Sequence, residues 1–213
     1  MVVLGGVTRL TRSGLSIVEW APLMGAIPPL SEVDWVTLFD KYKLTPEYQK
    51  VNLGMDLAGF KGIFWLEYLH RLLGRLIGIA FLVPFLYFLI RKQIDKPLVP
   101  KLVAMFVLGG LQGLMGWLMV ASGLVDVPRV SPYRLTAHLG LAVAIYGYML
   151  WVALDLLYPR PAAVAPPLRR FGWAVTGLTI LALLAGGFVA GTRAGFAFNS
   201  FPLMNGRFLP EGM

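Results

Sequence analysis

Four apolar runs dominate this sequence, and each is long enough to cross a lipid bilayer. They cover residues 63–90, 98–120, 135–157 and 171–190. A bilayer core about 30 Å thick needs roughly 20 apolar residues in a helix. Because lipid offers the backbone no hydrogen-bond partners, these runs must be helices rather than open strands. The sequence therefore predicts an all-α polytopic membrane helix bundle, with four full transmembrane helices plus an N-terminal stub.

The distribution of charge predicts how these helices are oriented. The chain carries a net charge of +8, and the excess lies in the loops after residues 90 and 157. Their basic residues are Arg91, Lys92, Lys96, Lys101, Arg160, Arg169 and Arg170. Short basic loops face the cytoplasm. Segment 8–62 has six basic and six acidic residues, and we expect it outside. Topology thus explains the charge, and no nucleic-acid partner is expected.

A short pattern occurs twice and predicts an internal duplication. It reads Thr-Arg-Ser-Gly at 11–14 with Pro-Leu-Met-Gly at 22–25, and Thr-Arg-Ala-Gly at 192–195 with Pro-Leu-Met-Asn-Gly at 202–206. Pro28 and Pro210 follow the two copies. We expect residues 1–170 to be a first repeat with a shortened opening helix and an outer loop over 8–62. Residues 171–213 would be the opening helix and partial outer loop of a second repeat, so the chain is expected to be truncated at both ends.

The chain has two histidines, His70 and His138, and no cysteine. The missing thiols exclude disulfides, iron–sulfur ligation and cysteine zinc sites. Each histidine lies six or seven residues past a predicted helix start, on the order of 10 Å along its helix. Facing histidines on two helices can bind an iron from opposite sides of a heme plane. The pair therefore predicts a heme site, with packing histidines or a proton relay as the alternative.

Charged side chains and small residues accompany His70. Arg71 can pair with Glu67 one turn back. Glu67 is expected either to exchange a proton during oxygen chemistry or to balance Arg71. The Gly74 and Gly78 pair predicts a trough that would admit either a macrocycle or a neighbouring helix.

Arginines and aromatic residues complete the predicted surroundings. Arg71, Arg75 and Arg134 suit heme propionates, because guanidinium groups bind carboxylates bidentately; interfacial anchoring is the alternative. Six aromatic residues are predicted to lie at the membrane interface: Trp20, Trp35, Trp65, Tyr42, Tyr48 and Tyr68.

Motifs along nearly the whole chain point to one family. They are Gly5-Gly6-Val7-Thr8-Arg9-Leu10-Thr11, Ser13-Gly14-Leu15-Ser16, Pro46-Glu47-Tyr48, Glu67-Tyr68-x-His70-Arg71-x-x-Gly74-Arg75, Gln112-Gly113, Gly116-Trp117, Tyr133-Arg134-Leu135, His138-Leu139 and Asn199-Ser200-Phe201-Pro202-x-Met204. With them the chain resembles the heme A synthase family, in particular its proteobacterial and mitochondrial branch.

The resemblance implies eight helices in two pseudo-symmetric halves, each with a histidine pair. His70 and His138 match the N-terminal pair, which holds the heme being oxidised, and Glu67 matches a glutamate thought to aid catalysis. The implied reaction converts a methyl group of heme O to a formyl group by oxygen-dependent hydroxylations, in support of cytochrome oxidase assembly. Heme b and iron are the further implied cofactors.

The resemblance also implies partners and a location. These are membrane lipid, an electron donor, heme O synthase and a homo-oligomer, in the bacterial inner membrane or alternatively the mitochondrial one. The family's second histidine pair would lie beyond residue 213. A bis-histidine b-type cytochrome and an inactive fragment therefore remain alternative functions.

Overall fold

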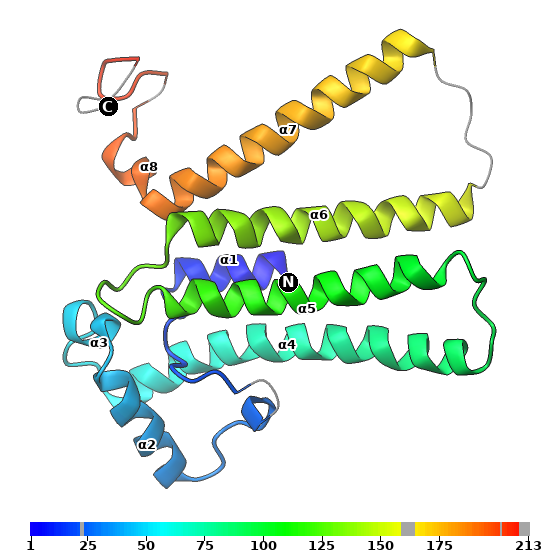
Figure 1. The fold of residues 1–213 in the computed structure, drawn as a ribbon. Helices are drawn as coiled ribbons and strands as arrows, with labels where there is room; N and C mark the ends of the chain where they lie inside the picture. The colour runs from blue at the N-terminus through cyan, green and yellow to red at the C-terminus, as the bar shows by residue number, and fades with distance from the viewer. Residues whose placement is uncertain (22–23, 159–164, 201, 209–213) are drawn as a thin grey trace. The chain divides into compact units, whose positions relative to one another are not determined.

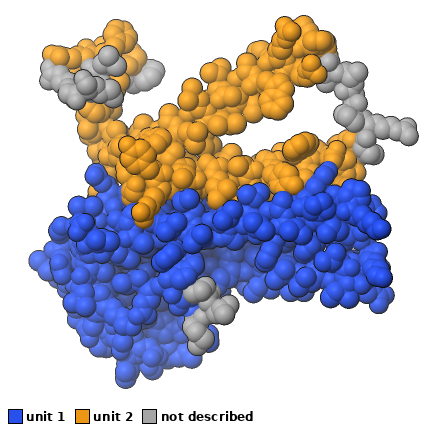
Figure 2. Space-filling view, in the orientation of Figure 1, with its two compact units in different colours: residues 1–130 blue, residues 131–213 orange. Residues whose placement is uncertain are grey.

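The computed structural model describes residues 1–21, 24–158, 165–200 and 202–208. Pro22, Leu23, Arg160, Phe201 and Pro210, which the sequence analysis named, lie outside these ranges. The chain divides into two compact units, Met1–Val130 and Ser131–Met213 (Figure 2). The boundary between these units separates two compact parts of the chain, whereas the predicted boundary at residue 170 separates two copies of a repeat. The repeat boundary stays a prediction.

Helices make up the regular structure in both units, and the described ranges hold no strand (Figure 1). The first unit contains α1 (Val2–Leu10), the short 3-10 turn η1 (Met24–Ala26), α2 (Glu32–Lys43), α3 (Pro46–Lys50), α4 (Leu57–Ile90) and α5 (Val99–Ala121). The second contains α6 (Pro132–Leu157), α7 (Pro166–Thr192) and α8 (Ala194–Ala197). The predicted all-α class is confirmed.

The four predicted spans are confirmed as α4, α5, α6 and α7, which are long and apolar enough to cross a membrane. Within their most apolar windows, 0, 6, 6 and 11% of residues are buried. Such helices expose apolar surface on nearly every side, which is stable only where lipid covers it.

Helix α4 begins earlier than the hydropathy pattern predicted. The Asp56 side chain caps it by accepting a hydrogen bond from the Gly59 backbone N–H at 2.8 Å. Its 34 residues extend about 51 Å, well beyond a bilayer core of about 30 Å. His70 thus lies thirteen residues after Leu57, and the expected offset of six or seven residues is wrong for it. His138 does lie six residues after Pro132, at the start of α6.

The predicted outer loop is largely helical. Helix α1 continues to Leu10, past the predicted start of the loop at residue 8, and α2 and α3 follow within the segment predicted as loop. Ser31 and Asp34 form a reciprocal capping box that starts α2. Thr45 caps α3 by accepting a hydrogen bond from the Tyr48 backbone N–H. Helix α2 packs on the first turns of α4, and α3 packs on α2; we call α2 and α3 together the outer cap.

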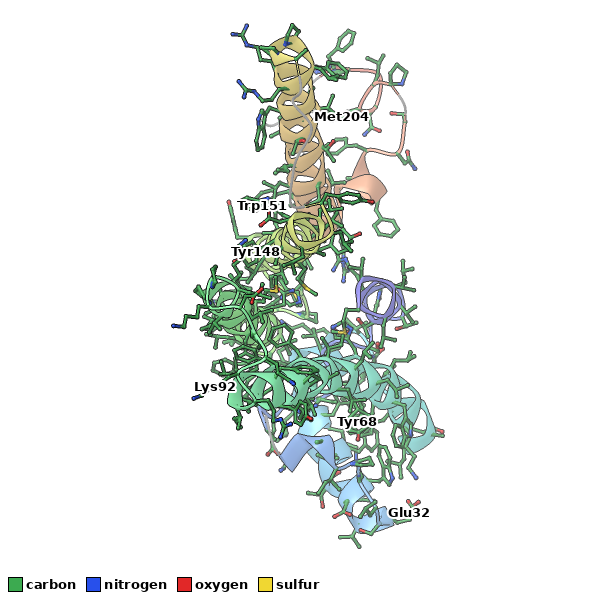
Figure 3. All side chains as sticks on the ribbon, turned by 90° about the vertical axis from the view of Figure 1, so that its right-hand side faces the viewer. Glu32, Tyr68, Lys92, Tyr148, Trp151 and Met204 are labelled. Atoms are coloured by element: carbon green, nitrogen blue, oxygen red, sulfur yellow. The ribbon has the colours of Figure 1, made fainter. Side chains whose placement is uncertain are left out.

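An aromatic core holds the outer cap on α4. Its buried members are Trp35, Phe39 and Tyr42 from α2 and Phe60, Phe64 and Tyr68 from α4. Phe60 stacks on both Phe39 and Tyr42, with ring centroids 5.2 Å apart in each pair. Figure 3 labels Tyr68 on α4 and Glu32 at the start of α2. The assignment of Trp35, Tyr42 and Tyr68 to the membrane interface is therefore wrong, since these side chains are buried in protein.

Two helix ends share one local geometry. Arg12 and Arg193 both have positive φ angles, 53° and 59°, just past the ends of α1 and α7. The residue before each arginine donates its hydroxyl to the carbonyl four residues earlier: Thr11 to Val7 and Thr192 to Phe188, both at 2.8 Å. These are the two copies of the Thr-Arg pattern, and the predicted duplication stays a prediction.

Glycines set the close approach of α7 to α6. A Cβ atom on Gly191 would lie 2.7 Å from Pro132 Cα, and one on Gly187 would lie 3.0 Å from Thr136 Oγ1. Gly140 of α6 similarly faces Leu184 of α7. Small residues four apart allow two spans to pack closely. The contact face of α6 therefore follows residues 132, 136 and 140.

Candidate functional site

His70 lies half-buried on α4, against α1. A Cβ atom on Gly5 of α1 would lie 3.1 Å from His70 Cε1, 3.8 Å from Nδ1 and 4.0 Å from Nε2. Only glycine allows this approach without a shift of the imidazole. Among the described residues, the buried Nδ1 has no hydrogen-bond partner. A buried polar atom without a partner is rare in native structures and points to a missing ligand or function.

Space is available beside His70 along α4. Within the part of the chain that the structure describes, a Cβ atom on Gly78 would meet no heavy atom within 4 Å. A Cβ atom on Gly74 would meet one, the Met1 Cε at 3.5 Å. The surface of α4 is therefore open at these two glycines, one and two turns past His70, and the predicted trough stays a prediction. An imidazole beside open helix surface leaves room for a flat ring system at His70.

Glu67 lies one turn before His70 and is only 3% exposed. Its Oε2 atom accepts three hydrogen bonds: from Ser16 N at 2.8 Å, Ser16 Oγ at 2.8 Å and Ile17 N at 2.9 Å. Its Oε1 atom accepts one from Arg71 Nη2 at 2.6 Å. The predicted Glu67–Arg71 pair is confirmed, and it satisfies a charge that burial would otherwise destabilise.

The two arginines of α4 donate to the backbone of the preceding segment. Arg71 Nη2 donates to Ile17 O at 3.0 Å, and Arg71 Nη1 donates to Glu19 O at 3.2 Å. Arg75 Nη2 donates to Ala21 O at 3.0 Å. Both guanidinium groups thus help to hold residues 17–21 on α4. Their binding of propionates stays a prediction.

His138 and Arg134 belong to the second unit. His138 is half-buried, and Arg134 is exposed in the first turn of α6. At 100° per residue, His138 lies about 200° around the helix from Thr136. It is therefore on the face of α6 opposite to the one that contacts α7. The pairing of His138 with His70 joins two units and stays a prediction.

Sequence reasoning missed two residues of this site. Ser16 and Gly5 occur in the quoted motifs, but no role was assigned to them. Nothing local identifies Ser16 as a partner of Glu67, because 51 residues separate them. The contact of Gly5 with His70 likewise depends on how α1 packs against α4.

The described ranges hold no cluster of three or more His, Cys, Asp or Glu side chains suited to a metal ion. A structural zinc site usually takes four protein ligands. Axial ligation of a heme needs only one histidine on each face of the ring. The histidines of this chain suit the second kind of site better than the first.

Comparison with known proteins identifies the family of the chain. The COX15-CtaA family model, described as cytochrome oxidase assembly protein, matches residues 1–213. A heme A synthase of Nitrosospira multiformis is 63% identical over 99% of this chain and 60% of its own length. Those of Nitrosomonas eutropha and Paramagnetospirillum magneticum are 56% and 54% identical over 100% of this chain and 61% and 62% of their own lengths.

The chain spans about 60% of the length of these curated relatives. No solved structure matches it. Its four apolar helices and its bacterial relatives identify an integral membrane protein of the bacterial inner membrane. Because the family model covers the whole sequence, the chain belongs to the COX15-CtaA family of cytochrome oxidase assembly proteins.

Proposed function

We propose that this chain binds heme O and takes part in the oxygen-dependent conversion of one heme O methyl group to a formyl group, in heme A biosynthesis. Each hydroxylation inserts one oxygen atom of O₂ into a C–H bond and reduces the other to water with an electron pair and protons from a donor. The second hydroxylation gives a geminal diol, which loses water to leave the formyl group. The observation that carries the proposal is the surroundings of His70. A partnerless buried nitrogen, open helix surface at two glycines and a hydrogen-bonded carboxylate lie within three turns of one helix.

His70 and His138 are the proposed axial ligands of the substrate heme. When bound, the heme iron would supply the centre at which oxygen is activated, after one of the two imidazoles has left the iron. Gly74 and Gly78 would admit the macrocycle beside His70. Arg75, Arg71 and Arg134 are the proposed partners of the propionates, and the exposed guanidinium of Arg134 is well placed for a group near the membrane surface.

Glu67 is the proposed group for proton exchange. Its two oxygens differ, because Oε2 accepts from three donors whereas Oε1 accepts from Arg71. A proton would therefore be taken up at Oε1, with displacement of the Arg71 contact. The hydrogen bonds at Oε2 would keep the carboxylate in place during that exchange.

The same proposal extends to partners. The reaction requires an electron donor, and the membrane-bound substrate makes heme O synthase a suitable source. A resident heme b and a homo-oligomer complete the expectations taken from the family.

The direct test is to load the purified chain with heme O, add a chemical reductant and oxygen, and analyse the extracted heme by mass spectrometry. We expect a product heavier by one oxygen atom and then the formyl product, with neither formed by His70→Ala. Heme O recovered unchanged from a chain that cycles between ferrous and ferric states would favour a b-type cytochrome. Absence of heme binding would make the histidines packing residues.

A further inference from the structure

The segment after α1 lies along α4 and is held by side chains that are four residues apart on that helix. Glu67 binds Ser16 and Ile17, Arg71 binds Ile17 and Glu19, and Arg75 binds Ala21. Residues at i, i+4 and i+8 share one face of a helix. We call these three side chains the ladder. The ladder fixes residues 16–21 at a defined height on α4.

A series of short contacts connects the ladder to α1. The Ser16 backbone N–H also donates to Ser13 O at 3.2 Å, and the Ser13 backbone N–H donates to Thr8 O at 3.0 Å. The Ser13 side chain is fully buried. Thr8 Oγ1 donates to Gly5 O at 2.8 Å. The turn after α1 is therefore closed on the helix, and the position of α1 follows the position of Ser16.

These contacts connect Glu67 with His70 by two routes. The first route passes through Ser16, Ser13, Thr8 and Gly5, and Gly5 lies against the imidazole of His70. The second route is the single turn of α4 that separates Glu67 from His70. The imidazole edge at Cε1 rests on Gly5, so a displacement of α1 changes the space available to the ring.

We propose that Ser16 and Gly5 are positioning residues that set the orientation of the His70 imidazole, with Ser16 acting through the Glu67 carboxylate and α1. The inference rests on the proposed function only where it assigns the oriented ring to heme ligation. Groups that orient a ligating histidine tune the bound metal, and their loss typically costs 10- to 100-fold in metal affinity.

Histidine labelled with carbon-13 at Cε1 tests the orientation without any heme. The chain has two histidines, so the spectrum contains two signals, and His70→Ala identifies the one from His70. Gly5→Ala should shift that signal, whereas the matched control Gly6→Ala should not, because a Cβ atom there would meet no described heavy atom within 4 Å. Ser16→Ala should also shift the His70 signal. Ser16→Thr keeps the hydroxyl group, so the His70 signal should appear at the position that it has in the parent chain.

The electron paramagnetic resonance spectrum of the ferric heme complex tests what the orientation is for. We expect altered g values and an affinity lowered about 10- to 100-fold in Gly5→Ala and Ser16→Ala, with Gly6→Ala and Ser16→Thr like the parent. If the carbon-13 signal is the same in all variants, the positioning inference is wrong whatever heme does. If that signal shifts as expected but the parent chain binds no heme, the positioning holds and the proposed function fails.

Discussion

Replacing Phe60 with alanine should release the outer cap from α4. Phe60 is fully buried and stacks on Phe39 and Tyr42 of α2. Truncation of a core phenylalanine costs about 3–5 kcal/mol. At about 1.4 kcal/mol per tenfold change, the undocked population of the cap should rise roughly 100- to 4,000-fold.

Limited proteolysis in detergent micelles measures this population. Trypsin can cleave after Lys41, Lys43 and Lys50, which lie in α2 and α3. When opening is fast relative to cleavage, the rate of cleavage follows the population of the open form. Leu53→Ala is the matched control, because Leu53 lies between the same helices and α4 but is 76% exposed. If Phe60→Ala is cleaved no faster than Leu53→Ala, the aromatic core does not hold the cap.

Three further predictions concern the helix contact in the second unit, the buried ion pair and the cap at high pH. Gly191→Ala should destabilise the packing of α6 and α7 by about 1–3 kcal/mol through overpacking against Pro132, whereas Gly186→Ala should not; an equal thermal unfolding midpoint for the two variants would contradict the contact. Glu67→Ala should lower the free energy of unfolding by about 3 kcal/mol, because it leaves the Arg71 charge without its carboxylate. The double variant Glu67→Ala with Arg71→Ala should lose less than the sum of the losses in the two single variants. If denaturant unfolding shows that the two losses simply add, the side chains are not coupled. Burial raises the pKa of the Tyr42 phenol. The neutral phenol therefore contributes its full stabilisation of the fold below a pH of about 10. This contribution is lost as the pH rises through the higher pKa of the folded state. Tyr42→Phe should flatten the alkaline fall in the unfolding midpoint, and an unchanged slope would refute this.

Hydropathy predicted the four spans because bilayer thickness fixes the length of an apolar helix. It missed the first turns of α4, where Gly59, Lys61 and Gly62 lower the apolar content although Asp56 caps the helix. It also missed α2, whose signal was the Ser31 to Asp34 capping box rather than hydropathy. The buried rings of the outer cap resembled interfacial aromatics in sequence, since both environments favour large amphipathic side chains.

Local spacing predicted part of the site. The Glu67–Arg71 pair followed from the i, i+4 rule and is present at 2.6 Å. The placement of Gly74 and Gly78 on one open face of α4 followed from helical periodicity. The donors from Ser16 and the contact of Gly5 with His70 depend on the docking of α1 and its following segment on α4. Tertiary packing of this kind leaves no periodic signal in one sequence.

The heme stoichiometry and visible spectrum of the purified chain and its two single histidine variants test the central claim most directly. The chain has only these two histidines, so no third imidazole can replace the one removed. We predict a low-spin bis-histidine heme in the parent chain, and loss of that spectrum in both His70→Ala and His138→Ala. Heme bound by either variant with the parent's stoichiometry and spectrum would contradict the claim.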